Sequence, residues 1–373
     1  MQSRATRRSF LTGAGAAAVA GLAGCSELDS GSGSGSERDG GVTDSGGSGS
    51  RTLTMIDWSY VYSNDVIAEF EERHDCTVER QAAQGSAETL AQLRTGRADY
   101  DLVPLGNYAV TPAIEEGYLQ PLDLDQVPAY GAVFDFLKKD YFERDGDVYG
   151  VPRSFGQTPL AINTDLVSRE ITALADLWDP ELDGLAGGRD DARLQALYRN
   201  AVVGEELNPT SVDDVDRGAL RSDLVDRLEL TGGLWNNGGE SEQLLRTKQV
   251  GVQPVWNYVI QAMQAENVPI DRVFPEEGTK AWFIQFTVRE GAEHPDLAHT
   301  FIQEWFTEMG YESLMAPSNI AIPSDRVFDE RNVDRSTFGL DDPEQFIYED
   351  PKPRELVEAY SRTWSEAKAE ANV

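Results

Sequence analysis

Residues 52–80 read TLTMIDWSYVYSNDVIAEFEERHDCTVER, and this stretch carries the pattern that decides the fold. Residues 52–56 are rich in apolar and β-branched side chains, which predicts a strand. Ser63 or Asn64 can cap a following helix whose apolar side chains recur every three to four residues. Residues 76–80 alternate apolar and polar side chains, which predicts a second strand. Strand, helix and strand in succession are typical of an α/β domain.

The same alternation continues along the chain. It predicts helices at 86–96 and 107–117. Two apolar segments, 160–162 and 284–288, are predicted to be strands that cross between two lobes. A final helix is expected at 355–371, where large apolar side chains recur about every four residues.

The composition limits the classes of protein that this chain can belong to. Its 373 residues are 40% hydrophobic and 9% aromatic, so it can bury a large core, and its length suggests two domains or one large one. The net charge of −33 argues against binding nucleic acid or an anionic membrane surface through a basic patch. With 2 Cys and 3 His, a zinc-rich or disulfide-rich scaffold is excluded.

The acidity also bears on the environment of the protein. Of the 32 basic residues, 26 are Arg and 6 are Lys. Like charges at this density repel one another in dilute buffer, whereas in ~1 M salt the screening length falls to ~3 Å. We therefore expect a halophilic protein. An ordinary acidic secreted protein is the alternative, and the scarcity of Lys counts against it.

The first residues predict an export signal at 1–24. Residues 6–11, TRRSFL, have the twin-arginine pattern, and a short apolar segment at 10–23 follows. This segment is shorter than the ~20 residues that a membrane-spanning helix needs. It ends in LAGC at 22–25, which predicts cleavage before Cys25 and lipidation of that residue. An uncleaved anchor helix with an incidental Cys is the alternative.

Residues 25–50 are expected to form the lipidated Cys and a flexible linker, since 16 of the 25 residues at 26–50 are Gly or Ser. Such a linker would hold a globular body away from a membrane to which only the lipid binds. We therefore expect the protein at the cell surface, lipid-anchored on the extracellular side of the cytoplasmic membrane.

A set of short motifs occurs in a definite order over residues 52–325. The motifs are Leu53-x4-Trp58-Ser59, Tyr100-Asp101-Leu102-Val103, Glu116 to Asp123 (EGYLQPLD), Tyr149-Gly150-Val151-Pro152, Asn163-Thr164-Asp165, Ala175 to Glu181 (ADLWDPE), Asp191-Ala192-Arg193 and Trp256-Asn257. This ordered set resembles the spermidine/putrescine-type extracellular solute-binding proteins of ABC importers.

The resemblance implies a fold and a division into lobes. The fold is α/β, a two-lobed periplasmic-binding-protein fold (type II), in which each lobe is a mixed β-sheet flanked by helices and the ligand cleft lies between the lobes. We expect residues 51–160 and 284–373 to form the first lobe, including the C-terminal helices, and residues 161–283 to form the second.

The resemblance also points to residues that would contact the ligand. Trp58 directly follows a predicted strand, and open α/β sheets place ligand sites at the carboxyl ends of their strands. Aromatic faces attract ammonium groups by about 0.5–2 kcal/mol each. Core packing is the alternative for any single Trp. The candidate ligand-binding residues are Trp58, Ser59, Tyr60, Tyr108, Asp191, Trp256 and Trp282.

Three carboxylates of the family pattern are replaced in this chain, because Tyr60, Leu194 and Ile284 stand in their places. A buried ammonium without its partner typically costs about 3–5 kcal/mol, so tight polyamine binding is not expected unless Asp57, Tyr60 or nearby acidic residues substitute for the lost carboxylates. A ligand with one cationic or aromatic group fits better. Arg153 and Arg193 also permit an organic anion, although salt bridges or a solvated surface explain them equally well.

The expected function is capture of a small organic solute by closure of the two lobes and delivery to an ABC permease, by a monomer without cofactor or metal. The sequence lacks the common motifs of metal-dependent hydrolases, serine hydrolases and phosphate-binding loops. An exported carboxylate-dependent hydrolase remains an alternative, because the chain has 65 acidic residues. A sensory solute receptor is the other alternative.

Overall fold

The predicted strand–helix–strand unit lies at the start of the part of the chain that the computed structural model describes, residues 51–96 and 99–373. β1 (Arg51–Asp57) pairs in parallel with β2 (Cys76–Ala82), and α1 (Asn64–His74) connects them. Ser63 caps α1 by accepting a hydrogen bond from the backbone N–H of Val66 at 3.2 Å. The predicted signal at 1–24, Cys25 and the linker lie outside the described residues.

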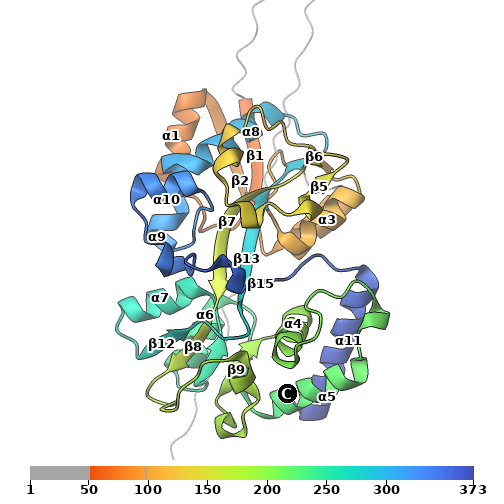
Figure 1. The fold of residues 1–373 in the computed structure, drawn as a ribbon. Coiled ribbons are helices and arrows are strands. Elements are labelled where there is room, and N and C mark those ends of the chain that lie inside the picture. Colours follow the sequence, from red (N-terminus) through yellow and green to blue (C-terminus); the bar gives the residue numbers. More distant parts are fainter. Residues whose placement is uncertain (1–50, 97–98) are drawn as a thin grey trace, which may run out of the picture. The chain divides into compact units, whose positions relative to one another are not determined.

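The first lobe is built on this unit and on segments from much later in the chain (Figure 1). Leu102 links β1 to β14 through isolated bridges to Met55 and Val288, and β14 pairs with β4. Its other elements are α2 (Ser86–Arg94), β3 (Leu105–Gly106), α3 (Asn107–Glu115), β4 (Leu119–Gln120), β5 (Glu143–Arg144), β6 (Asp147–Val148), β14 (Val288–Arg289), α8 (Pro295–Glu304), α9 (Ala316–Ser318) and α10 (Asp325–Arg331).

The second lobe contains a mixed five-stranded sheet in the order β10-β9-β11-β8-β12. β9 is parallel to both β10 and β11, whereas β8 is antiparallel to β11 and β12. The elements of this lobe are β8 (Leu160–Asn163), β9 (Ala186–Arg189), α4 (Ala192–Val203), α5 (Arg217–Glu229), β10 (Thr231–Trp235), α6 (Gly238–Arg246), β11 (Val252–Pro254), α7 (Asn257–Ala265) and β12 (Ile270–Val273).

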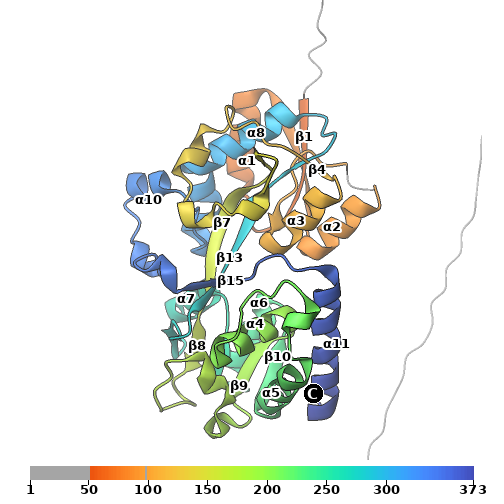
Figure 2. The same cartoon turned by 45° about the vertical axis from the view of Figure 1, so that its right-hand side comes forward.

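Two long antiparallel strands, β7 (Val151–Thr158) and β13 (Thr279–Phe286), run from one lobe to the other, and β15 (Phe346–Tyr348) lies beside β13 (Figures 1 and 2). The predicted crossing strands need correction, since residues 160–162 belong to the second-lobe sheet and β13 begins before residue 284. β7 could not be predicted because all eight of its residues are buried although they read VPRSFGQT, so neither an apolar run nor an alternation marks this strand.

The C-terminal helix, α11 (Arg354–Ala371), also corrects the expected lobe boundaries. Its buried residues Leu356, Tyr360 and Trp364 pack with Leu220 and other apolar side chains of α5 and with Ala196 of α4. Figures 1 and 2 show α11 beside α5. This helix therefore belongs with the second lobe, although residues 284–373 were all expected in the first. Its apolar face is visible in the sequence, but the partner of that face is not.

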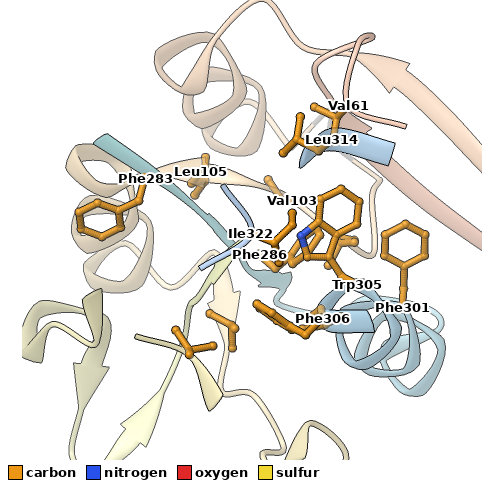
Figure 3. Close-up of a cluster of buried hydrophobic side chains, with 14 of the residues drawn as sticks. Val61, Val103, Leu105, Phe283, Phe286, Phe301, Trp305, Phe306, Leu314 and Ile322 are labelled. Carbon is orange, nitrogen blue, oxygen red and sulfur yellow. The ribbon is translucent and has the colours of Figure 1, made fainter. Parts of the chain in front are cut away.

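The core of the first lobe holds one connecting strand in place. Phe286, Phe301 and Trp305 pack edge to face, with Phe286 and Trp305 ring centroids 5.6 Å apart at an interplanar angle of 90° (Figure 3). The Trp305 indole N–H donates a hydrogen bond of 2.9 Å to the carbonyl of Arg153 on β7. The core thus fixes the backbone of a strand that, as shown below, lines a cavity. No helix in the described part of the chain is long and apolar enough to cross a membrane.

Candidate ligand-binding cavity

A cavity of about 370 Å³ is lined by residues of both lobes and of the two connecting strands. Its volume lies within the ~300–1,000 Å³ range of small-molecule sites. Four of its lining residues follow strands of the two main sheets. Trp58 follows β1, Asp191 follows β9, Asn237 follows β10 and Trp256 follows β11. The cavity therefore lies at the carboxyl ends of these strands, where open α/β sheets place ligands.

Six of the seven candidate residues line this cavity, namely Trp58, Tyr60, Tyr108, Asp191, Trp256 and Trp282. Ser59 does not. It is exposed in the turn after β1 and is not among the lining residues, so its contact with a ligand stays a prediction. Leu194 and Ile284 also line the cavity, as Tyr60 does, so all three positions where a family carboxylate is replaced face one space.

Aromatic side chains form much of the wall. Trp256 and Tyr258 stack with ring centroids 5.8 Å apart at 13°, and Trp235 packs edge-on to Trp256 at 5.2 Å. Trp282 lies against β7 at Gly156, where an added Cβ would come within 2.3 Å of Trp282 Cζ2. Glycine at position 156 is therefore required for this placement of the indole.

Asp191 is engaged by its own helix and by a neighbouring arginine. Its Oδ1 accepts hydrogen bonds from the backbone N–H groups of Arg193 and Leu194 at 3.1 and 3.3 Å, which caps α4. Its Oδ2 lies 3.3 Å from Arg193 Nη2. Burial opposes ionisation, but Arg193 and Arg189 outweigh it and hold the pKa of Asp191 below its usual value. Asp191 is thus charged and already partnered.

A second carboxylate, Glu349, lies between two cations. Its Oε1 is 3.3 Å from Arg193 Nη1, and its Oε2 is 3.8 Å from Lys280 Nζ. The Arg193 guanidinium also lies 4.1 Å from the ring centroid of Tyr108, so this residue of α4 contacts a residue of α3 in the first lobe. Burial lowers the pKa of Lys280, while Glu349 opposes that effect.

The third carboxylate, Asp57, is buried behind the wall and does not line the cavity. Its Oδ2 lies 3.1 Å from Arg153 Nη1 and accepts a hydrogen bond from the Tyr62 hydroxyl. Its Oδ1 accepts a hydrogen bond of 2.7 Å from the backbone N–H of Trp58. Burial raises the pKa of Asp57, and Arg153 opposes this. Asp57 therefore cannot take the place of the carboxylates that the family pattern has at other positions.

Arg189, at the end of β9, is a cation of the cavity that sequence reasoning missed. Its guanidinium lies 5.4 Å from the ring centroid of Trp256 and 5.9 Å from that of Trp235. Within residues 51–96 and 99–373 it makes neither a hydrogen bond nor an ion pair through its side chain. Open α/β sheets place ligand sites at the carboxyl ends of their strands, which is the reason for choosing Trp58. The same reason applies to Arg189, which is the last residue of β9 and lines the cavity.

Three further lining residues were also missed. Lys280 lies two residues before Trp282 on β13, so the period of a strand could have placed it on the same face. Tyr258 follows the predicted Trp256 by two residues. No pattern in the neighbouring sequence marks Glu349 as a cavity residue, because the strand that it follows, β15, has only three residues. In the described part of the chain no group of three or more His, Cys, Asp or Glu side chains could hold a metal ion.

The two lobes share a pair of connecting strands, and residues of both lobes line the cavity. This arrangement is that of a protein that binds a small solute. The model of the family "bacterial extracellular solute-binding protein" matches residues 65–337, and the chain belongs to this family. By its family it is a solute-binding protein and not an enzyme.

Individual relatives agree with this assignment. The chain is 25% identical over 256 residues to spermidine/putrescine-binding periplasmic protein 1 of Haemophilus influenzae, covering 67% of this chain and 69% of that protein. The structure of the spermidine/putrescine substrate-binding protein PotD of Streptococcus pneumoniae matches with a TM-score of 0.75 at 16% identity, covering 86% of this chain and 100% of that one. The TpPotD lipoprotein of Treponema pallidum matches with a TM-score of 0.73 at 18% identity, covering 85% and 99%.

Proposed function

We propose that this protein is the exported, lipid-anchored solute-binding subunit of an ABC importer, and that its lobes close on a small organic solute and deliver it to the permease. The observation that carries this proposal is the cavity, because its aromatic and charged side chains come from both lobes. A solute bound to both sets of side chains stabilises the arrangement in which they face each other.

Export, anchoring and environment form part of the proposal. The twin-arginine pattern and Cys25 support export and lipidation at the extracellular side of the membrane. A lipoprotein among the structural relatives is consistent with this. The net charge of −33 supports function in molar salt, as a monomer tethered by the linker.

The relatives named for spermidine and putrescine suggest a polyamine, but the cavity of this chain supports a different solute. Tyr60, Leu194 and Ile284 line it where the family pattern has carboxylates. The two carboxylates that do line it, Asp191 and Glu349, are already paired with Arg193 and Lys280. An ammonium group would have to break these pairs, so we propose that spermidine and putrescine bind weakly or not at all.

Calorimetry in molar NaCl tests whether the cavity is the binding site. A panel of osmolytes, vitamins, amines and organic acids is first screened by thermal shift. We expect at least one solute to raise the unfolding temperature and its affinity to fall about 100-fold or more in a Trp58→Ala, Trp256→Ala double variant, because two aromatic walls are lost. Tyr118→Ala, which removes a first-lobe aromatic residue outside the cavity, should retain the affinity.

Two results would contradict the proposal. If no solute of any class raises the unfolding temperature, the protein does not capture a small organic solute. If the double variant binds as tightly as the unmodified protein, the solute binds elsewhere.

A further inference from the structure

The charged side chains around the cavity are not balanced. The cations that line it are Arg153, Arg189, Arg193 and Lys280. The carboxylates that pair with them are Asp57, Asp191 and Glu349. Four cations against three carboxylates leave one positive charge in excess, within a chain whose net charge is −33. The ligand site thus has a charge opposite in sign to that of the whole molecule.

The unbalanced charge belongs to Arg189. The other three cations each have a carboxylate within 4.0 Å, whereas Arg189 has no ion pair or hydrogen bond from its side chain within the described chain. Trp256 and Trp235 hold its guanidinium through their ring faces, which leaves its five N–H donors unused. Arg189 and Arg193 also help to lower the pKa of Lys280, after burial, so these cations are close enough to repel one another.

Among the residues that line the cavity, buried hydrogen-bond donors without a partner outnumber buried acceptors without one. Arg153 is 2% exposed, and its Nε has no hydrogen-bond partner in the described structure, although its Nη1 lies 3.1 Å from Asp57 Oδ2. Trp282 Nε1 has no hydrogen-bond partner there either. Lys280 Nζ has only the ion-pair contact to Glu349 at 3.8 Å. Among the described lining residues, Glu349 Oε1 is the buried acceptor without a hydrogen bond, and it already lies 3.3 Å from Arg193 Nη1. Buried donors without acceptors are costly, so a bound group that accepts hydrogen bonds would be stabilised here.

Three helix N-termini add to the positive potential. α2, α3 and α7 have nine residues each, and the N-cap residues before them, Gly85, Gly106 and Trp256, all line the cavity. None of these N-cap residues accepts a side-chain hydrogen bond from its helix. The first N–H groups of a helix carry partial positive charge and favour an anion.

We propose that the captured solute is a small organic anion, whose carboxylate or comparable acidic group binds Arg189 and Lys280 while its carbon skeleton lies against Trp256 and Trp282. This inference rests on the proposed function and specifies the class of its solute. A monoanion neutralises the excess positive charge and supplies acceptors to the unmatched donors. An amine would add to the excess of positive charge and to the excess of hydrogen-bond donors.

Quenching of tryptophan fluorescence tests the sign of the local charge without knowledge of the natural solute. The signal of Trp256 is obtained as the difference between the unmodified protein and a Trp256→Phe variant. Iodide and caesium are compared at constant ionic strength, with acrylamide as a neutral reference. We expect iodide to quench Trp256 about twofold or more better than caesium, although the whole chain is strongly acidic. Arg189→Gln should abolish this preference and Arg189→Lys should retain it.

A second measurement uses solutes matched in shape but not in charge. Phenylacetate, phenylacetamide and phenethylamine form one set, and glutarate, glutaramide and cadaverine form another. By calorimetry in molar NaCl we expect the acid of a set to bind most tightly, and Arg189→Gln to weaken it about 10- to 100-fold, since hydrogen bonds to a charged group are lost. Arg362→Gln, an exposed change on α11, should leave its affinity unchanged.

The outcomes separate this inference from the function on which it rests. The proposal of an anionic solute would be contradicted if caesium quenched Trp256 better than iodide, or if an amine bound more tightly than its matched acid. Neither result would contradict the proposal that the protein captures a small solute. The proposal of an anionic solute would also be contradicted if the captured solute, whatever its charge, bound to the Arg189→Gln variant as tightly as to the unmodified protein. Failure of every solute class in the thermal-shift panel would instead contradict solute capture itself.

Discussion

Individual side chains of the site differ in how far the sequence reveals them. Trp58 and Trp256 could be placed because each belongs to an ordered motif, and Trp282 because the family resemblance points to it; all three line the cavity. Arg189 also ends a strand, but it stands out because its side chain has no ion-pair partner within the described chain. The local sequence cannot show this, because ion-pair partners come from residues that are distant in sequence. Arg193 illustrates this, since its partner Glu349 lies far from it in the sequence, near the C-terminus.

Asp191 provides a test of the charges around the cavity. Its pKa is lower in the folded protein than in the unfolded chain, so the folded state binds fewer protons there. Its charge therefore stabilises the fold above the unfolded pKa of about 3.9, and this contribution is lost as the pH falls through the folded pKa. We expect Asp191→Asn to lower the free energy of unfolding by about 1–2 kcal/mol at neutral pH, because Asn still caps a helix but cannot pair with Arg193.

The measurement is denaturant unfolding of both proteins in molar salt from neutral pH down to pH values below 4. The difference between them should shrink toward zero at the acidic end. Asp216→Asn is the matched control, because Asp216 caps α5 in the same way without an ion pair to a described cation. A difference for Asp191→Asn that stays constant with pH would show that its charge is not what stabilises the fold.

At the scale of elements, the segments with a regular pattern were predicted well. α1, α2, α3 and α11 lie where apolar spacing and capping residues place them. β7 was missed because burial on all sides, rather than on one face, removes the alternation that marks a strand. The lobe to which α11 belongs could not be predicted either, because an apolar face specifies that a helix is buried but not against which element.

The connecting strands also explain why the site needs the whole chain. β7 contributes Arg153, and β13 contributes Lys280 and Trp282. The carbonyl of Arg153 is held by Trp305 of the first-lobe core. A change in the angle between the lobes would therefore move the cavity residues of the second lobe relative to those on these strands. This is the arrangement expected of a protein that closes on its solute.

At the scale of the whole molecule, the distribution of charge makes a prediction about salt. The mature chain predicted to begin at Cys25 loses three Arg and no acidic residue, so its net charge becomes −36. Because salt screens the repulsion between acidic side chains, we expect the unfolding temperature to rise steeply from low to molar NaCl. Thermal unfolding across a salt series measures this. A flat response would mean that the acidity has no role in stability.

The same screening should act differently on the site. Charges that are buried or partly buried are screened less than those on the surface. The excess positive charge at Arg189 can therefore attract an anion in molar salt while the acidic surface is neutralised by counterions. This combination allows an acidic protein to bind an anionic solute.

The most direct measurement of the central claim is a crystal structure with the tightest-binding acid of the matched sets, grown in molar salt. We predict that the acid occupies the cavity between the lobes, with its carboxylate oxygens within hydrogen-bond distance of the Arg189 guanidinium and its skeleton against Trp256. A solute bound outside the cavity, or one whose acidic group points away from Arg189, would contradict the account.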